Sequence, residues 1–181
     1  MAPLPTSEYI MARIKRWDDY FMRICDTIAS KSPCLSRQIG SVIVRDHSIV
    51  STGYNGPPRG VPHCGDRILS SYDDDPLSSE EPRVMDPHSC PRRMLGYASG
   101  NGLHLCTAAH AESNCISNAA RNGASTVSCV MYLNTVLPCK DCMAKIINTG
   151  IHVLVCYPGE YDKMSLWMLK HSPIQVRRWV P

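Results

Sequence analysis

Apolar and polar positions along this chain change period several times, and each change predicts a new element. The first period is helical, with apolar residues on one face at Trp17, Tyr20 or Phe21, Ile24 and Ile28. Pro33 ends this helix because proline disfavours helical geometry at the residue before it. Two extended runs follow, Ser41–Val44 and Ile49–Thr52, joined by the turn Arg45–Ser48. The pattern predicts a helix followed by a β-hairpin.

The second half of the chain alternates helical and extended periods. Helices are predicted at Ala108–Ala120, Lys140–Thr149 and Ser165–Lys170, and strands at Val127–Leu133, Ile151–Cys156 and Ile174–Val180. Asn122-Gly123 and Gly150 supply the helix stops. The order is helix, hairpin, insertion, then three helix–strand pairs. Such alternation predicts an α/β fold, a three-layer α/β/α sandwich around a mixed central sheet.

One long segment breaks this regularity. Residues 65–89 carry runs such as Tyr72–Pro76 and Ser78–Pro82, which have little to bury. We interpret this as a surface insertion, extending over about 65–105, in a single domain of residues 1–181. Loops of this length are usually functional or disordered. A passive loop is the simplest interpretation; a lid and an oligomer contact are the alternatives.

Composition narrows the class of protein. The net charge of +3 is too small to indicate a nucleic-acid or membrane partner. Apolar runs fall short of the ~20 residues that span a bilayer, and Met1–Thr6 does not resemble a secretory signal. The ten cysteines are therefore expected as free or metal-bound thiols in a reducing, cytoplasmic setting.

Two short motifs carry metal-binding side chains. His110-Ala111-Glu112 begins one predicted helix, and Pro138-Cys139-Lys140-Asp141-Cys142 begins the next. A strand-crossover unit brings adjacent helix starts to the same end of a sheet. One imidazole and two thiolates suit a tetrahedral zinc ion whose fourth position stays open for water. The sequence therefore predicts a zinc site built from His110, Cys139 and Cys142.

Glu112 distinguishes a catalytic site from a structural one. It lies two residues from His110, where it can take a proton from water and pass it to a leaving group. A C-x-x-C pair alone is equally typical of a closed structural zinc site or a redox pair. A closed site needs a fourth ligand, and a redox pair has no use for His-x-Glu. Together the two motifs match the signature of zinc nucleobase deaminases.

The chain resembles the cytidine deaminase superfamily and, within it, the deoxycytidylate (dCMP) deaminases. The resemblance runs from about Trp17 to Tyr157. It rests on the stretches Cys34–Gly40, Thr52–Gly56, His110–Asn114 and Pro138–Cys142. The stretch Gly53-Tyr54-Asn55-Gly56 is more typical of dCMP deaminases than of free-nucleoside or tRNA deaminases.

The resemblance implies hydrolysis of dCMP to dUMP and ammonia, which supplies dUMP for thymidylate synthesis. Water activated by zinc attacks C4 of cytosine, and Glu112 protonates N3 and then the departing amine. The resemblance places the Ala111 backbone and Tyr132 near the base and Asn55 at the sugar. Arg121 is implied in phosphate or effector binding, with helix C-terminal charge complementarity as its alternative role. Arg37 is a weaker phosphate candidate.

Regulation and assembly are also implied by the resemblance alone. Related enzymes are commonly oligomers, with a hexamer expected here and a dimer or trimer as alternatives. They are activated by dCTP and inhibited by dTTP with Mg²⁺. Residues 53–56 match the segment associated with that regulation.

A second zinc ion is expected from four further cysteines. Some dCMP deaminases carry a second, structural zinc in matching regions, and thiolates can close such a site. The expected ligands are Cys34, Cys64, Cys90 and Cys106, with His104 or His63 as substitutes for one of them. The alternative is that these are free buried thiols. We expect the remaining four cysteines in the core: Cys25, Cys115, Cys129 and Cys156.

Two other functions remain open from the sequence. One is a deaminase of a different base or nucleotide, such as dCTP, tRNA adenosine or a riboflavin precursor. The other is a zinc-stapled interaction module without catalysis. A stronger basic patch would favour the tRNA enzyme, and the carboxylate of Glu112 argues against the module.

Overall fold

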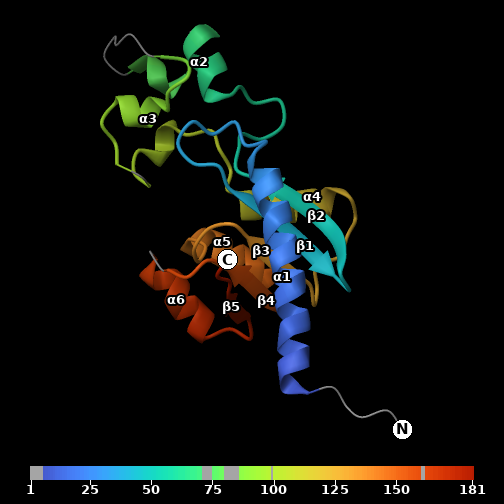
Figure 1. Cartoon of the computed structure of the whole chain (residues 1–181). Coiled ribbons are helices and arrows are strands. Elements are labelled where there is room, and N and C mark those ends of the chain that lie inside the picture. Colours follow the sequence, from blue (N-terminus) through green and yellow to red (C-terminus); the bar gives the residue numbers. More distant parts are fainter. Residues whose placement is uncertain (1–5, 71–74, 80–85, 99, 160–161) are drawn as a thin grey trace.

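A five-stranded mixed sheet forms the centre of the molecule (Figure 1). The computed structural model describes residues 6–70, 75–79, 86–98, 100–159 and 162–181. In the sheet order β2-β1-β3-β4-β5, the first three strands pair antiparallel and β3, β4 and β5 pair parallel. The strands are β1 (Gly40–Arg45), β2 (Ser48–Tyr54), β3 (Val130–Leu133), β4 (Val153–Cys156) and β5 (Gln175–Arg178). The predicted mixed sheet is confirmed.

Helices cover both faces of this sheet. One face packs against α1 (Ser7–Ala29), through a core that includes Phe21 and Met22. The other face packs against α4 (Ala111–Arg121), α5 (Lys140–Asn148) and α6 (Lys163–Lys170). The three-layer α/β/α architecture expected from the sequence is confirmed, and so is the order of its principal elements.

Some boundaries differ from the predicted ones for local reasons. The helix α1 starts at Ser7, ten residues before Trp17, with Thr6 accepting a capping hydrogen bond from the Tyr9 amide. Residues 6–13 are all exposed, so no buried face marks this part of the helix in the sequence. The strand β3 starts late because Ser128 has a φ of 59°, in the left-handed region that strands do not use.

A buried polar network ties α1 to the sheet. Asp18 is buried and accepts hydrogen bonds from the Tyr132 hydroxyl at 2.9 Å and from the Arg177 guanidinium at 2.7 and 3.0 Å. These partners come from β3 and β5. Because a buried carboxylate without partners is costly, this network fixes the position of α1 over the sheet.

The insertion is more regular than the sequence indicates. It contains α2 (Cys64–Ser70), α3 (Pro91–Met94) and two 3-10 turns, Pro76–Ser79 and Leu103–Leu105. Figure 1 shows α2 and α3 together, set off from the sheet beyond the end of α1. The segment that the sequence marks as the least regular, residues 65–89, thus includes helical structure at 65–70 and 76–79. Residues 71–74 and 80–85 lie outside the described part of the chain.

Buried arginines organise this insertion in place of an apolar periodicity. Arg67 forms a salt bridge with Asp75 and donates a 2.7 Å hydrogen bond to the Leu105 carbonyl. Arg92 is also buried and donates to the Asn101 carbonyl. These contacts are made by charged and backbone polar groups, so the pattern of apolar residues in the sequence does not reveal them.

In the described parts of the chain, every helix is too short or too polar to cross a membrane.

Candidate active site

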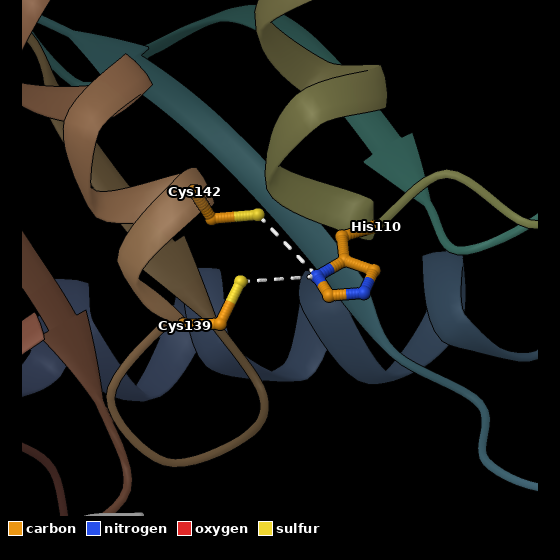
Figure 2. A group of neighbouring side chains, drawn as sticks. All are labelled: His110, Cys139 and Cys142. Carbon is orange, nitrogen blue, oxygen red and sulfur yellow. Dashed lines mark hydrogen bonds between the residues drawn. The ribbon is translucent and has the colours of Figure 1, made fainter. Parts of the chain in front are cut away.

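Two helix N-termini meet at the carboxyl end of the central strands. His110 is the N-cap residue of α4, and Cys139 is the N-cap residue of α5. Neither side chain caps its own helix, and Cys142 lies in the first turn of α5. All three side chains turn toward the space between the helices instead (Figure 2).

The three donor atoms have the spacing of a tetrahedral metal site. His110 Nδ1 lies 3.5 Å from Cys139 Sγ and 3.4 Å from Cys142 Sγ. The three atoms lie within 4.8 Å of one another. Zinc–nitrogen and zinc–sulfur bonds of about 2.0 and 2.3 Å at a tetrahedral angle place nitrogen and sulfur roughly 3.6 Å apart. The residues present therefore fit a zinc ion, with Nδ1 as the ligand atom of the imidazole.

The pKa values of the two thiols, Cys139 and Cys142, shift in opposite directions. Hydrogen bonding from Cys142 and His110 lowers the pKa of Cys139 well below its usual range. The same bond to Cys139, together with burial, raises the pKa of Cys142. One thiolate is thus favoured before any metal binds, and a metal ion would displace the second proton. The N-terminal ends of α4 and α5 further favour negative charge here.

Glu112 lies in the first turn of α4 and is almost fully buried. Burial raises the pKa of its carboxyl group, while His110 and a hydrogen bond from Cys142 act in the opposite direction. A carboxyl group with a raised pKa exchanges protons more readily near neutral pH, which is the requirement for a general acid–base. The structure therefore places a buried carboxyl group beside the donor atoms.

The end of β2 and the loop that follows it are held directly against α4. An ideal Cβ on Gly53 would lie 2.3 Å from the Cys115 amide nitrogen and 2.6 Å from the Ala111 carbonyl oxygen, so only glycine permits this approach. Gly56 and Ala109 exchange two backbone hydrogen bonds, just before His110. The predicted segment 53–56 thus lies next to the site, and Gly53 has a packing role there.

Asn55 is buried and braces the loop that precedes β1. Its Oδ1 accepts hydrogen bonds from Ser32 Oγ and the Ile39 amide, both at 2.8 Å, and its Nδ2 donates to the Arg37 carbonyl at 2.8 Å. An asparagine side chain has two donor hydrogens and two acceptor sites. One N–H of Asn55 therefore has no partner among the described residues.

The structure does not bring every implied substrate residue to the site. Arg121 is exposed at the opposite end of α4 from His110, and Arg37 is also exposed. Tyr132 faces α1, where its hydroxyl binds Asp18, on the sheet face opposite α4 and α5. Tyr54 is partly exposed beside the site, and the Ala111 side chain is buried in the core.

The four cysteines of the expected second zinc line one small cavity of about 20 Å³. The residues that line it include His63 and the four cysteines, Cys34, Cys64, Cys90 and Cys106. His104 lies outside the cavity and contacts Tyr97. Burial raises the pKa of Cys64, and the other three thiols contribute to the rise. Among the described residues, His110, Cys139 and Cys142 are the only group of three or more potential metal donors whose ligand atoms all lie within 4.8 Å of one another.

Three residues near the site were not assigned a role from the sequence. Asn114 donates hydrogen bonds to the carbonyls of Tyr54 at 2.8 Å and Gly56 at 3.3 Å, which clamps the loop to α4. Ser113 and Lys145 form a chain that reaches Cys142. Ser113 lies three residues after His110, and Lys145 lies three residues after Cys142. This spacing was the available signal in the sequence, because residues three apart share a helical face.

Sequence comparisons identify relatives over most of the chain. Residues 15–158 match the family model described as the cytidine and deoxycytidylate deaminase zinc-binding region. A deoxycytidylate deaminase of Saccharomyces cerevisiae is 34% identical over 97% of this chain and 49% of the yeast protein. That of Mycobacterium phage D29 is 31% identical over 80% of this chain and 95% of the phage protein. The chain thus spans about half the length of its yeast relative.

Solved structures agree at the level of the fold. The crystal structure of a dCMP deaminase from cyanophage S-TIM5, in complex with dCMP and dUMP, superposes with a TM-score of 0.62. The two proteins are 19% identical, and the match covers 89% of this chain and 95% of that chain. Because the family model spans both metal-binding helices and most of the remaining residues, the chain belongs to the cytidine and deoxycytidylate deaminase zinc-binding family.

Proposed function

We propose that this protein hydrolyses dCMP to dUMP and ammonia, a reaction that supplies dUMP for thymidylate synthesis. The observation that carries the proposal is the buried carboxyl group of Glu112 beside the donor set of His110, Cys139 and Cys142. Relatives named deoxycytidylate deaminase, 30–34% identical to this chain, support dCMP as the substrate. The zinc-binding description of the family supports zinc as the metal.

The protein's own residues then have defined tasks. His110, Cys139 and Cys142 would hold a zinc ion, which would lower the pKa of a water molecule toward neutrality. Glu112 accepts a proton from that water and delivers it to N3 of cytosine as the bond from oxygen to C4 forms. Glu112 next takes the proton of the new C4 hydroxyl group and passes it to the exocyclic amine; the C4–N4 bond breaks, ammonia leaves and the C4 carbonyl group of dUMP forms. Burial of Glu112 keeps bulk water from competing for these protons.

Substrate positioning is proposed from the groups around this centre. The backbone N–H of Ala111 belongs to the first turn of α4, where such groups lack intrahelical partners, and it faces the base. The remaining N–H of Asn55 contacts the sugar. The phosphate binds near the exposed side chain of Tyr54, with Arg121 proposed for phosphate or effector binding and Arg37 as the weaker phosphate candidate.

Replacing Glu112 by glutamine tests this mechanism. Glutamine keeps the size of the side chain but cannot carry the proton, so kcat for dCMP should fall by about 10²–10⁴-fold. Ammonia release and dUMP formation measure the effect, while zinc content should stay at the wild-type level. Glu8→Gln, on the exposed start of α1, is the matched control and should keep full activity. An unchanged rate for Glu112→Gln would show that the mechanism is wrong.

The substrate itself is decided by the same assay with the wild-type protein. We expect ammonia from dCMP in preference to CMP, dCTP, deoxycytidine and tRNA. A preference for dCTP or for tRNA adenosine would replace the proposed substrate, and no turnover of any of them would favour the zinc-stapled module.

Regulation is proposed for residues 53–56. They pack against α4 through Gly53 and Asn114, so an effector bound at this loop can reach His110 and Glu112 through few contacts. The effectors expected from the family are dCTP as activator and dTTP with Mg²⁺ as inhibitor.

Exposed apolar residues at the start of α1, including Tyr9, Ile10 and Met11, support association of copies of the chain, and a hexamer is proposed.

The kinetics of dCMP turnover test this regulation. Added dCTP should raise the rate at low dCMP concentration, and dTTP with Mg²⁺ should lower it. Light scattering on the same samples gives the mass of the oligomer. Rates that do not respond to either nucleotide would contradict the proposed regulation, and a monomeric mass would contradict the proposed assembly.

A second, structural zinc is proposed in the cavity lined by Cys34, Cys64, Cys90 and Cys106. The cavity has space for an ion and for little more, and binding there would draw the four sulfurs together. Such a site would tie the insertion to the core.

All ten cysteines are free thiols in the structure, which supports a reducing, cytoplasmic location.

Metal analysis tests the second site. The wild-type protein should contain two zinc ions per chain. Cys64→Ala and Cys139→Ala should each lose one of them, because they remove ligands from different sites. A single zinc in the fully loaded wild-type protein would contradict the second site, and so would a Cys64→Ala variant that keeps both ions.

A further inference from the structure

A hydrogen-bond chain joins an exposed lysine to the sulfur of Cys142. Lys145 Nζ donates to Ser113 Oγ at 2.9 Å, and Ser113 Oγ lies 3.6 Å from Cys142 Sγ. Ser113 comes from α4 and Lys145 from α5. The chain therefore crosses the seam between the two helices whose N-termini carry the metal donors.

The direction of each hydrogen bond follows from the groups involved. An ammonium group has donor hydrogens and no acceptor, so the Ser113 oxygen must accept from Lys145. The hydroxyl hydrogen of Ser113 is then available to Cys142, whose sulfur is its remaining partner among the described contacts. A positive charge at Lys145 thus polarises the hydroxyl group that faces the sulfur.

The Cys142 sulfur depends on hydrogen bonds from protein groups, because its side chain is buried away from bulk water. In the described residues, Lys145 takes part in none of the salt bridges, so its charge is not committed to a carboxylate. Among the described residues, it is the cation whose side chain donates a hydrogen bond to Ser113.

We propose that Ser113 and Lys145 are positioning residues that hold the Cys142 thiolate in its metal-binding orientation and so slow the release of zinc. The inference rests on the proposed zinc site and adds residues that touch neither the metal nor the substrate. Hydrogen bonds to a thiolate orient the ligand and offset part of its charge. Loss of such an outer partner typically costs 10–100-fold in metal affinity or activity. Because Lys145 is exposed to solvent, we expect an effect near the lower limit.

The experiment measures zinc release from the intact protein to an excess of a chromophoric chelator. The phase that belongs to this site is the one that is absent in Cys142→Ala. Ser113→Ala and Lys145→Met should each release this zinc about tenfold faster than the wild type. The double variant should be no faster than Ser113→Ala, because both changes break the same chain.

Two conservative variants and one control separate this role from a general structural or electrostatic effect. Ser113→Thr and Lys145→Arg keep the donors and should release zinc at close to the wild-type rate. Lys140→Met removes a charge from the same helix, next to Cys139, but Lys140 binds Asp141 instead of Ser113, so its rate should not change.

The outcomes distinguish this proposal from the proposed function. Equal release rates for the wild type, Ser113→Ala and Lys145→Met would overturn the positioning role and leave the zinc site intact. An equal acceleration by Lys140→Met would also overturn it, because the effect would then be general electrostatics. A wild-type protein that holds no zinc at His110 would overturn both proposals.

Discussion

The site depends on one constraint, that the first turns of α4 and α5 lie side by side. Parallel pairing of β3 with β4 fixes the helix between them, so Cys139 and Cys142 emerge at the carboxyl end of β3. The position of α4 is fixed from the other side by β2. Gly53 allows backbone-to-backbone contact, and Ser51 Oγ donates to the Cys115 carbonyl at 2.7 Å. The distances between His110 and the two sulfurs follow from these contacts.

Much of this arrangement was predictable because its signals are local. The helices α4 and α5 end at glycine or asparagine stops, and their metal donors sit at their first residues, where the chain enters the helix. Alternation of helices and strands then implies which helix ends meet. The role proposed for Glu112 follows from its spacing to His110, and its burial is what the structure adds.

The rest depends on tertiary contacts that leave little trace in the sequence. The insertion folds around buried Arg67 and Arg92, residues that a hydropathy pattern assigns to the surface. Side chains alternate between the faces of a strand. Met131 and Leu133 face the core beneath α4 and α5, so Tyr132, which lies between them, faces α1. This alternation explains why Tyr132 is not near the metal donors. The link from Lys145 to Cys142 through Ser113 requires two helices and was visible only in the structure.

The central claim is that zinc held by His110, Cys139 and Cys142 enables dCMP deamination. The most direct test is dUMP formation by protein stripped of metal and reloaded stepwise with zinc, with Cys139→Ala treated in parallel. The account predicts no turnover without metal, recovery in proportion to zinc bound at these residues, and no recovery in Cys139→Ala. Undiminished turnover in the metal-free protein, or recovery in Cys139→Ala, would contradict it.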